Sequence, residues 1–526
     1  MEIFEEINLF NPNNRKLRNC FFFFFAFAIC GYLSIIVSFC PYCDDWCRYT
    51  ANISVGKLNA CRYFTLFLES LVYASPFVSD FAPLSHLFSC ALLAYGAVIC
   101  LKLFNVNIDD KWKILCLTPM IVNPYLLELM MYRFDNFFTI IGLLLAVLAA
   151  YLSSKNDKKF FFIQSALLFI TIFIYQPTVS AYLIIFTYLF TLQIQSGLSF
   201  FKAIYKMRYW FYSMLTVAIL YIPFTYQLAY STTSDGKVLV IPYNLENIKI
   251  ISSNILRYFL TLYEDWSPNP IGQIFFGLAF IFILDTVRRT WQKNKSVISL
   301  FIVLLGIFCF FISPYGPCPF LKVLVFKGNE SIVPRIMCSA GIVISLILYS
   351  NYTLFEQIKL SKIFYRFLVI IFSVWSLTFT NSAGNTIHCL RLLQHNVIYD
   401  LSKDVFRITN NNEKISHICV AGAVTSQTLK NFAEFYPIIL RIVPEQWCVP
   451  TYCQIALMNS DFAKQLLELN PKETLFHNDK YKNKKLIKTH MKYDIFVIDD
   501  SIMFIEFKDH NKFESPRHSI IRVKED

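Results

Sequence analysis

The segment CFFFFFAFAICGYLSIIVSF, residues 20–39, is an unbroken apolar run that decides the class of fold. A helix needs about 20 predominantly apolar residues to cross the hydrocarbon core of a membrane. Ten further runs of similar length follow it along the chain. They cover residues 84–104, 112–130, 136–153, 160–175, 177–196, 209–230, 271–287, 297–313, 334–352 and 364–380. This pattern predicts an α-helical polytopic membrane protein with about 11 transmembrane helices.

The composition excludes a water-soluble protein. Of the 526 residues, 56% are hydrophobic and 16% are charged, whereas a soluble domain has about 25% charged residues. The net charge is +12, but the basic residues gather in connectors between the apolar runs and in a lysine-rich C-terminal part. Nucleic-acid binding would require a basic face on a soluble module at the inner side of the membrane. We therefore expect membrane lipids, and no nucleic acid, as partners.

Lysine and arginine residues also indicate how the chain crosses the membrane. If successive runs cross in alternation, five basic clusters fall on one face, within residues 15–18, 155–159, 202–208, 288–295 and 359–366. By the positive-inside rule that face is cytoplasmic. The first run is too long for a signal peptide and lacks a small-residue cleavage site, so we expect it to be retained.

The domain organisation follows from these runs. We expect a cytoplasmic N-terminus over residues 1–19, a transmembrane domain over 20–380 and a C-terminal domain on the outer side over 381–526. The last part has ordinary composition and predicts a small α/β module. Helical spacing of apolar residues and β-type runs place its elements. Helices are expected over 386–407, 432–442 and 461–469, and strands over 415–424 and 493–507.

Two adjacent carboxylates follow the first run, in the string YCDDWCRY at residues 42–49. Asp44, Asp45 and Arg48 are costly to keep at a membrane surface unless they have a partner or a task. The same outer loop carries Arg62 and an amphipathic segment, Tyr63–Tyr73, which we expect to lie in the membrane interface. This acid pair is the strongest indication of function in the sequence.

Further charges occur where other runs meet the outer face. Glu128, Arg133 and Asp135 lie in NPYLLELMMYRFDNFF, residues 123–138, and Arg335 lies in SIVPRIM at the start of a later run. Each could be a charged turn or an anchor at the membrane surface. Taken together, three outer loops deliver acids and arginines to one face.

Carboxylates beside cations at the level of the lipid headgroups suit one reaction in particular. A lipid-phosphate sugar would reach them from the bilayer. An aspartate would accept the proton of an incoming hydroxyl, and arginines would hold the departing phosphate as its charge rises. We assign the base to Asp45, with Asp44 as the alternative. We assign no cofactor, and the binding of a divalent metal by Asp44, Asp45 and Glu128 is left open, because hard cations need more oxygen ligands than these.

Several strings resemble those of a known family of membrane glucosyltransferases that modify bacterial O-antigen. These are the phage-type serotype-converting Gtr enzymes, the type II glucosyltransferase family, and their chromosomal relatives. The similar strings are DDWCR (44–48), NPYLLELMMYRFDNFF (123–138), YQPTVSAYL (175–183), VPRIMCSAG (333–341) and NSAGNTIHCLRLLQHNVIYDL (381–401).

The resemblance implies a GT-C-type fold in the bacterial inner membrane, with the active face and the C-terminus in the periplasm. It also implies a polyprenyl-phosphate-sugar donor, such as polyprenyl-phosphate-glucose, and a lipid-linked O-antigen acceptor. Transfer would invert the configuration at the anomeric carbon. By position, Asp44 and Asp45 match the paired acids of the family, and Arg133 and Asp135 match its YRFD element. Cys47 and Lys57 depart from the small or turn-forming residues common there.

Two other functions would share this topology. A transporter or flippase of a lipid-linked saccharide should show internal repeats and charges or helix breaks in the middle of its spans, whereas here the charges lie at the ends of the runs. An O-antigen polymerase or ligase should have a large outer loop late in the chain, and loop 231–270 is modest in size.

Overall fold

The computed structural model describes most of the chain, in fourteen segments. These are residues 2–38, 41–42, 45, 48, 62–74, 79–230, 244–320, 334–356, 359–411, 417–421, 424, 426–443, 485–498 and 502–508. Contacts divide the chain into two units. Unit 1 comprises Met1–Ser38, Ser54–Gly384 and Phe435–Ile438, and unit 2 comprises Phe39–Ile53, Asn385–Glu434 and Ile439–Asp526.

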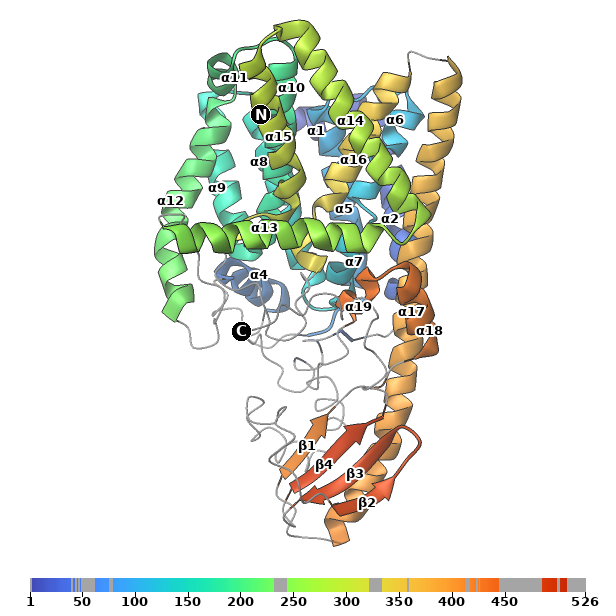
Figure 1. Ribbon diagram of the computed structural model, residues 1–526. Coiled ribbons are helices and arrows are strands. Elements are labelled where there is room, and N and C mark those ends of the chain that lie inside the picture. The colour runs from blue at the N-terminus through green and yellow to red at the C-terminus, as the bar shows by residue number, and fades with distance from the viewer. Residues whose placement is uncertain are drawn as a thin grey trace. The chain divides into compact units, whose positions relative to one another are not determined.

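Unit 1 is helical throughout the residues that the structure describes (Figure 1). Long helices alternate with short α and 3₁₀ pieces, the latter labelled η. In chain order they are α1 (Glu2–Ile7), η1 (Pro12–Asn14), α2 (Arg15–Val37), α4 (Tyr63–Tyr73), α5 (Leu84–Leu103), α6 (Lys111–Leu115), η2 (Thr118–Met120), α7 (Pro124–Met131), α8 (Asn136–Ser154), α9 (Lys158–Ile174), η3 (Gln176–Val179), α10 (Ser180–Gln195), α11 (Phe200–Lys206), α12 (Arg208–Tyr230), α13 (Leu245–Trp266), α14 (Pro270–Asn294), α15 (Val297–Ile312), η4 (Ser313–Tyr315), η5 (Cys318–Phe320), η6 (Pro334–Met337) and α16 (Ala340–Phe355). The long helix α17 (Lys359–Asn411) contributes residues to both units.

Seven helices in the described part of the chain are long and apolar enough to cross a membrane. They are α2, α5, α8, α10, α14, α15 and α17. The expectation of eleven spans is therefore only partly met. The run at 112–130 is not one straight helix, because Lys111–Met120 and Pro124–Met131 meet at a bend of 56°. If this broken pair counts as one span, the number rises to eight. Pro119 and Pro124 account for the break, since proline cannot continue the hydrogen-bonding ladder of a helix.

Charged residues are paired at one end of unit 1. Lys155 contacts Glu6 at 2.6 Å and Lys16 contacts Asp109 at 2.6 Å. Hydrogen bonds from Lys155 and from the Tyr151 hydroxyl hold the pKa of Glu6 below its usual range. A third group forms where α16 ends, since Glu356 contacts both Lys113 at 2.8 Å and Lys362 at 3.1 Å. Several of the basic clusters read from the sequence thus lie at one end of the helices, as the positive-inside pattern requires.

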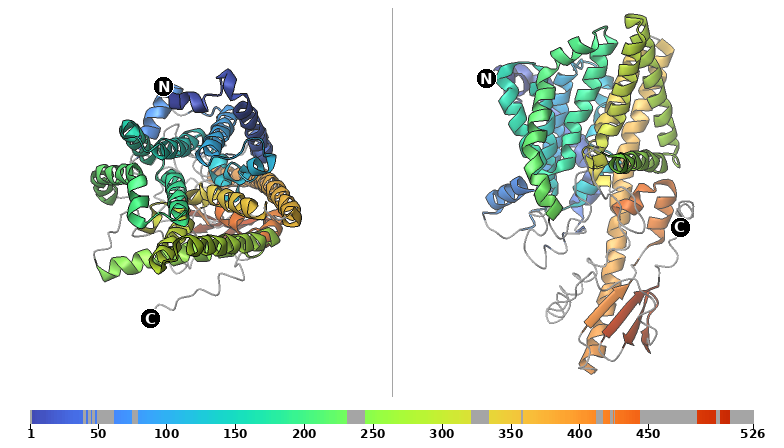
Figure 2. Two further views of the ribbon diagram at one scale, coloured as in Figure 1. Left: turned by 90° about the horizontal axis from the view of Figure 1, so that it is seen from above. Right: turned by 60° about the vertical axis from the view of Figure 1, so that its left-hand side comes forward.

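The opposite end of unit 1 is built from short elements. Figures 1 and 2 show α4 and α7 at this end and α13 lying across the long helices. Glycine allows a close approach here. A Cβ on Gly341, at the start of α16, would collide with the carbonyl oxygen of Pro119 and the side chain of Asn123. The segments that carry Glu128 and Arg335 are therefore packed closely together.

Helix α13 has its polar side inward. Asn254 donates to the Pro319 carbonyl at 3.0 Å, and the Tyr258 hydroxyl donates to the Phe311 carbonyl at 2.7 Å. On its other side, large apolar side chains such as Leu256 are exposed. An outward apolar face is typical of a helix that lies against lipid. The sequence reading treated 231–270 as a loop and missed this helix.

Unit 2 contains a four-stranded sheet in the order β1-β4-β3-β2. Its strands are β1 (His417–Ala421), β2 (Lys485–Thr489), β3 (Tyr493–Ile498) and β4 (Ile502–Phe507), with β1 parallel to β4 and the other pairs antiparallel. The C-terminal part of α17 packs on this sheet through apolar side chains. Asp404 on α17 accepts hydrogen bonds from Lys488 and, at 2.9 Å, from the Tyr493 hydroxyl. Burial and this carboxylate raise the pKa of Tyr493 well above its usual range.

The expected C-terminal elements are mostly found. Strands occur within 415–424 and 493–507, and the helix expected over 432–442 is two helices, α18 (Gln427–Phe435) and α19 (Ile438–Ile442). The helix expected over 461–469 lies outside the described residues. Strand β2 was missed, because its lysines were attributed to a solvated surface.

The boundary at residue 380 was wrong as a helix end, since α17 continues through it. A single glycine costs a helix only about 1 kcal/mol, and Gly384 has a packing reason. A Cβ there would collide with the Ser34 hydroxyl on α2. Asn381 reinforces this contact by donating to the Cys30 carbonyl at 2.6 Å.

Candidate functional site

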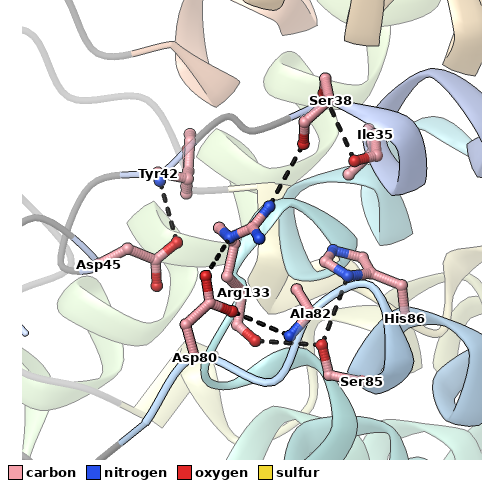
Figure 3. Close-up of polar contacts among 9 residues, drawn as sticks. All are labelled: Ile35, Ser38, Tyr42, Asp45, Asp80, Ala82, Ser85, His86 and Arg133. Atoms are coloured by element: carbon pink, nitrogen blue, oxygen red, sulfur yellow. Dashed lines mark hydrogen bonds and ion pairs between the residues drawn. The ribbon is translucent and has the colours of Figure 1, made fainter. Parts of the chain in front are cut away.

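Arg133 lies just after α7 and is buried in unit 1. Its Nε donates to Asp80 Oδ2 at 2.8 Å, and its Nη1 donates to the Ser38 carbonyl at 3.3 Å (Figure 3). Asp80 is itself fixed, because its Oδ1 accepts the backbone N–H of Ala82 at 2.9 Å. The guanidinium is thus held by groups from two other segments, the end of α2 and the turn before α5.

The local sequence explains how α7 positions this arginine. Asn123 caps the helix by accepting the N–H groups of Tyr125 and Leu126 at 3.0 and 3.1 Å, and Pro124 fills the first helical position. Both residues favour a helix start. All eight residues of α7 are buried. A short, capped and fully packed helix gives a rigid base for the charges on it and after it.

Glu128 on α7 is paired with Arg335, 207 residues further along the chain. The carboxylate accepts the Arg335 backbone N–H at 2.7 Å, and its Oε1 lies 3.6 Å from the Arg335 Nη1. The guanidinium also donates to the Tyr132 hydroxyl and stacks 5.3 Å from the centre of that ring. Glu128 is only 2% exposed, so its charge needs compensation within the protein, and these contacts contribute to it.

Arg62 and Asp135 lie at helix starts in the same unit. Arg62 precedes α4 and stacks over Tyr175, with its Cζ 4.7 Å from the ring centre. Thr65 ties α4 down by donating to the Ile174 carbonyl at 2.8 Å. Asp135 precedes α8 and makes no side-chain cap on it. The amphipathic segment Tyr63–Tyr73 is a helix, as expected, with Thr65 buried and apolar residues outward.

Asp45 and Arg48 belong to unit 2, and both are buried. Asp45 closes a tight turn, in which its Oδ2 accepts the Tyr42 N–H at 2.9 Å and its own N–H donates to the Tyr42 carbonyl at 2.9 Å. The Tyr42 hydroxyl in turn donates to the Ile442 carbonyl. One oxygen of the predicted base is therefore held by the backbone. Asp44 lies outside the described residues.

The sequence-predicted charges pair across the chain rather than within one loop. The structure joins Arg133 to Asp80 and Glu128 to Arg335, whereas the sequence reading grouped Glu128, Arg133 and Asp135 by their closeness in NPYLLELMMYRFDNFF. Among the residues that the structure describes, no three His, Cys, Asp or Glu side chains lie close enough to hold a metal ion.

Three residues of this region were missed. Asp80 was given no role in the outer loop, Tyr132 was quoted only as part of the YRFD element, and His86 was not singled out. The string SDFAPLSH at 79–86 carried a signal, because an acid and a histidine flank the proline at which an apolar run begins. Polar groups at the end of a span need partners or a function.

Comparison with known protein families matches residues 33–346 to the family described as Glucosyl transferase GtrII. The match covers more than half of the 526 residues. The chain belongs to this glucosyl transferase family. No curated protein and no solved structure gives a significant match.

Family membership supports glycosyltransferase activity, with a sugar donor and an acceptor as substrates. The matched region contains both carboxylate–arginine pairs, as well as Asp44, Asp45 and Arg48. It ends within α16 and leaves out the sheet of unit 2. The expected resemblance to the type II glucosyltransferases is thereby confirmed.

The Glu128–Arg335 pair yields a prediction for stability. Replacing Arg335 with methionine should lower the free energy of unfolding by on the order of 3 kcal/mol, because a buried carboxylate loses a cation that contacts it. Thermal unfolding of the detergent-solubilised protein would show this. Glu128→Gln combined with Arg335→Met should recover most of the loss. A single Arg335→Met variant as stable as the parent would mean that the pair contributes little to the fold.

Proposed function

We propose that this chain transfers a sugar from a polyprenyl-phosphate donor to O-antigen or a related surface polysaccharide. Glucose is the first candidate for this sugar. The reaction takes place on the periplasmic face of a bacterial inner membrane, in a GT-C-type transmembrane domain. The acceptor is carried on its own lipid. The family assignment and the charges of the outer loops support this function.

One observation carries the proposal. Two buried or half-buried arginines, Arg133 and Arg335, are each held by a carboxylate at the end of unit 1 opposite to the basic connectors. Arginine is suited to phosphate because its planar fork donates two parallel hydrogen bonds. Asp80 and Glu128 fix the orientation of the two guanidinium groups, as positioning of charge before reaction requires.

The chemistry needs a base and a cation. The acceptor hydroxyl gives its proton to Asp45, and its oxygen attacks the anomeric carbon of the donor sugar from the face opposite the phosphate. The bond between that carbon and the phosphate oxygen breaks, and the configuration at the carbon inverts. The phosphate goes from one negative charge to two, and Arg133 and Arg335 stabilise the added charge. Arg48, Arg62 and Asp135 are assigned to substrate binding.

The structure of the polysaccharide tests this function. NMR of O-antigen from cells with and without the gene should show one added hexose branch only when the protein is present. A polysaccharide that is unchanged in composition but altered in length would favour a polymerase or ligase. Loss of all branches made by other transferases would favour a flippase for their common donor.

The orientation yields a second prediction, by cysteine labelling in intact cells. Lys158, replaced with cysteine in a cysteine-depleted parent, should react only after the membrane is permeabilised, because its cluster is basic and cytoplasmic. A cysteine appended at the C-terminus should react with an impermeant reagent from outside. Labelling of position 158 from outside alone would overturn the assignment of faces.

A further inference from the structure

His86 lies beside the Arg133 site in unit 1. It is the third residue of α5, and its side chain is only 1% exposed. The Nδ1 atom lies 3.4 Å from the Ser85 hydroxyl, which donates to the Arg133 carbonyl at 3.2 Å. The other ring nitrogen, Nε2, is buried and makes no hydrogen bond within the described residues. In Figure 3 this nitrogen is turned away from Ser85 and towards the Arg133 guanidinium.

Hydrogen-bonding logic assigns the state of the ring. A carbonyl oxygen only accepts, so the single hydroxyl proton of Ser85 goes to Arg133. The serine oxygen is then an acceptor towards His86, and Nδ1 must carry the ring proton. In the neutral ring Nε2 is left with a lone pair. Within the described residues, the nitrogen that faces the arginine is therefore an acceptor without a donor.

We propose that His86 is a further binding residue of the sugar-phosphate site and that its Nε2 accepts a hydrogen bond from a hydroxyl group of the transferred sugar. A phosphate diester is ionised at neutral pH and has no proton to give, so Nε2 selects a sugar hydroxyl. Arg133, next to it, selects the phosphate. The two side chains together complement the two halves of a glycosyl phosphate.

The buried orphan atom supports this assignment. Buried polar atoms in proteins nearly always have a partner, and an exception calls for a ligand, a water or a functional reason. The ring is held in place by Ser85, so it does not have to be ordered on binding. This inference rests on the proposed function, because it requires a sugar-phosphate donor.

The experiment is a cycle of variants and donors with the full-length protein in vesicles. The donors are polyprenyl-phosphate-glucose and its four monodeoxy analogues. For the parent, kcat/KM should fall roughly 10-fold with one of the analogues, as expected for one lost hydrogen bond. The kcat/KM of the His86→Phe variant should be lower than that of the parent by about the same factor with the full donor. With the one analogue that affects the parent, kcat/KM of the variant should not fall further.

Two further variants sharpen the comparison. His86→Gln brings an amide oxygen near the position of Nε2 and should restore most of the activity and the discrimination. Ser89→Ala, one turn along α5, removes a buried hydroxyl that donates within its own helix, at 2.9 Å to the Ser85 carbonyl, and should match the parent. If His86→Phe does not accumulate in the membrane, His86→Asn takes its place, because its amide is too short to reach the Nε2 position.

The outcomes separate the two proposals. Suppose that the parent transfers sugar and His86→Phe either matches it or loses the same factor with every donor. The role of His86 is then wrong, and the proposed function is not affected. A parent that transfers sugar from none of the donors overturns the proposed function and this inference with it.

Discussion

Replacing Asp45 with asparagine is expected to slow sugar transfer about 10²–10⁴-fold, the usual effect of losing a general base. Asparagine keeps the size of the side chain and an acceptor oxygen for the Tyr42 N–H, which lies 2.9 Å from Asp45 Oδ2. The turn should therefore persist while the ability to take a proton is lost. The measurement is the initial rate at saturating donor and acceptor, on variants shown to be inserted in the membrane.

Two comparisons make this prediction specific. Asp44→Asn should have a smaller effect, because neighbouring side chains in extended or turn backbone generally point in different directions and Asp44 is assigned to bracing Arg48 or the interfacial helix. Asp109→Asn removes an exposed carboxylate paired with Lys16 and should behave as the parent. If Asp44→Asn and Asp45→Asn both transferred sugar at the parental rate, the catalytic role of the acid pair would be wrong.

Replacing Arg133 with alanine is expected to raise the KM for the donor roughly 10- to 100-fold, because hydrogen bonds to charged groups contribute about 1.5–3 kcal/mol. Arg133→Lys should recover only part of this, since an ammonium keeps the charge but not the planar fork. The KM for the acceptor should change little. Steady-state kinetics with each substrate varied in turn would distinguish an effect on the donor KM from an effect on the acceptor KM.

Arg133 also holds a largely buried carboxylate, so its removal has a structural cost that must be separated from binding. Asp80→Asn combined with Arg133→Ala removes both charges of this pair and should restore stability but not donor affinity. Arg289→Ala is a matched control, because that arginine pairs with Asp285 on α14 at 2.7 Å. Donor KM values that are equal in the parent and the Arg133 variants would mean that Arg133 has a structural role and does not bind the donor.

The sequence predicted the class of fold because apolar runs are a direct consequence of the membrane. It failed where tertiary contacts decide. The bend between α6 and α7 and the continuous helix through Gly384 depend on what packs against them, which a hydropathy pattern does not contain. Helix α13 was not predicted, because the polar segment 231–270 was interpreted as a loop. In the structure, polar side chains of α13 such as Asn254 face the protein.

The charged residues of the site could be chosen from the sequence, but their pairing partners could not. Charged residues at the ends of apolar runs are rare enough to be conspicuous, which is why Glu128, Arg133 and Arg335 could be chosen from the sequence. Their pairing could not, because Asp80 and Arg133 are 53 residues apart and Glu128 and Arg335 are 207 apart. His86 became visible only through its burial and its orphan nitrogen.

The most direct test of the central claim is transfer from a defined donor by the purified protein. Vesicles containing the full-length chain would receive polyprenyl-phosphate-glucose labelled in the sugar, together with lipid-linked O-antigen. Label should enter the polysaccharide with the parent and fall to a trace with Asp45→Asn. Absence of transfer by the parent, or equal transfer by Asp45→Asn, would contradict this claim.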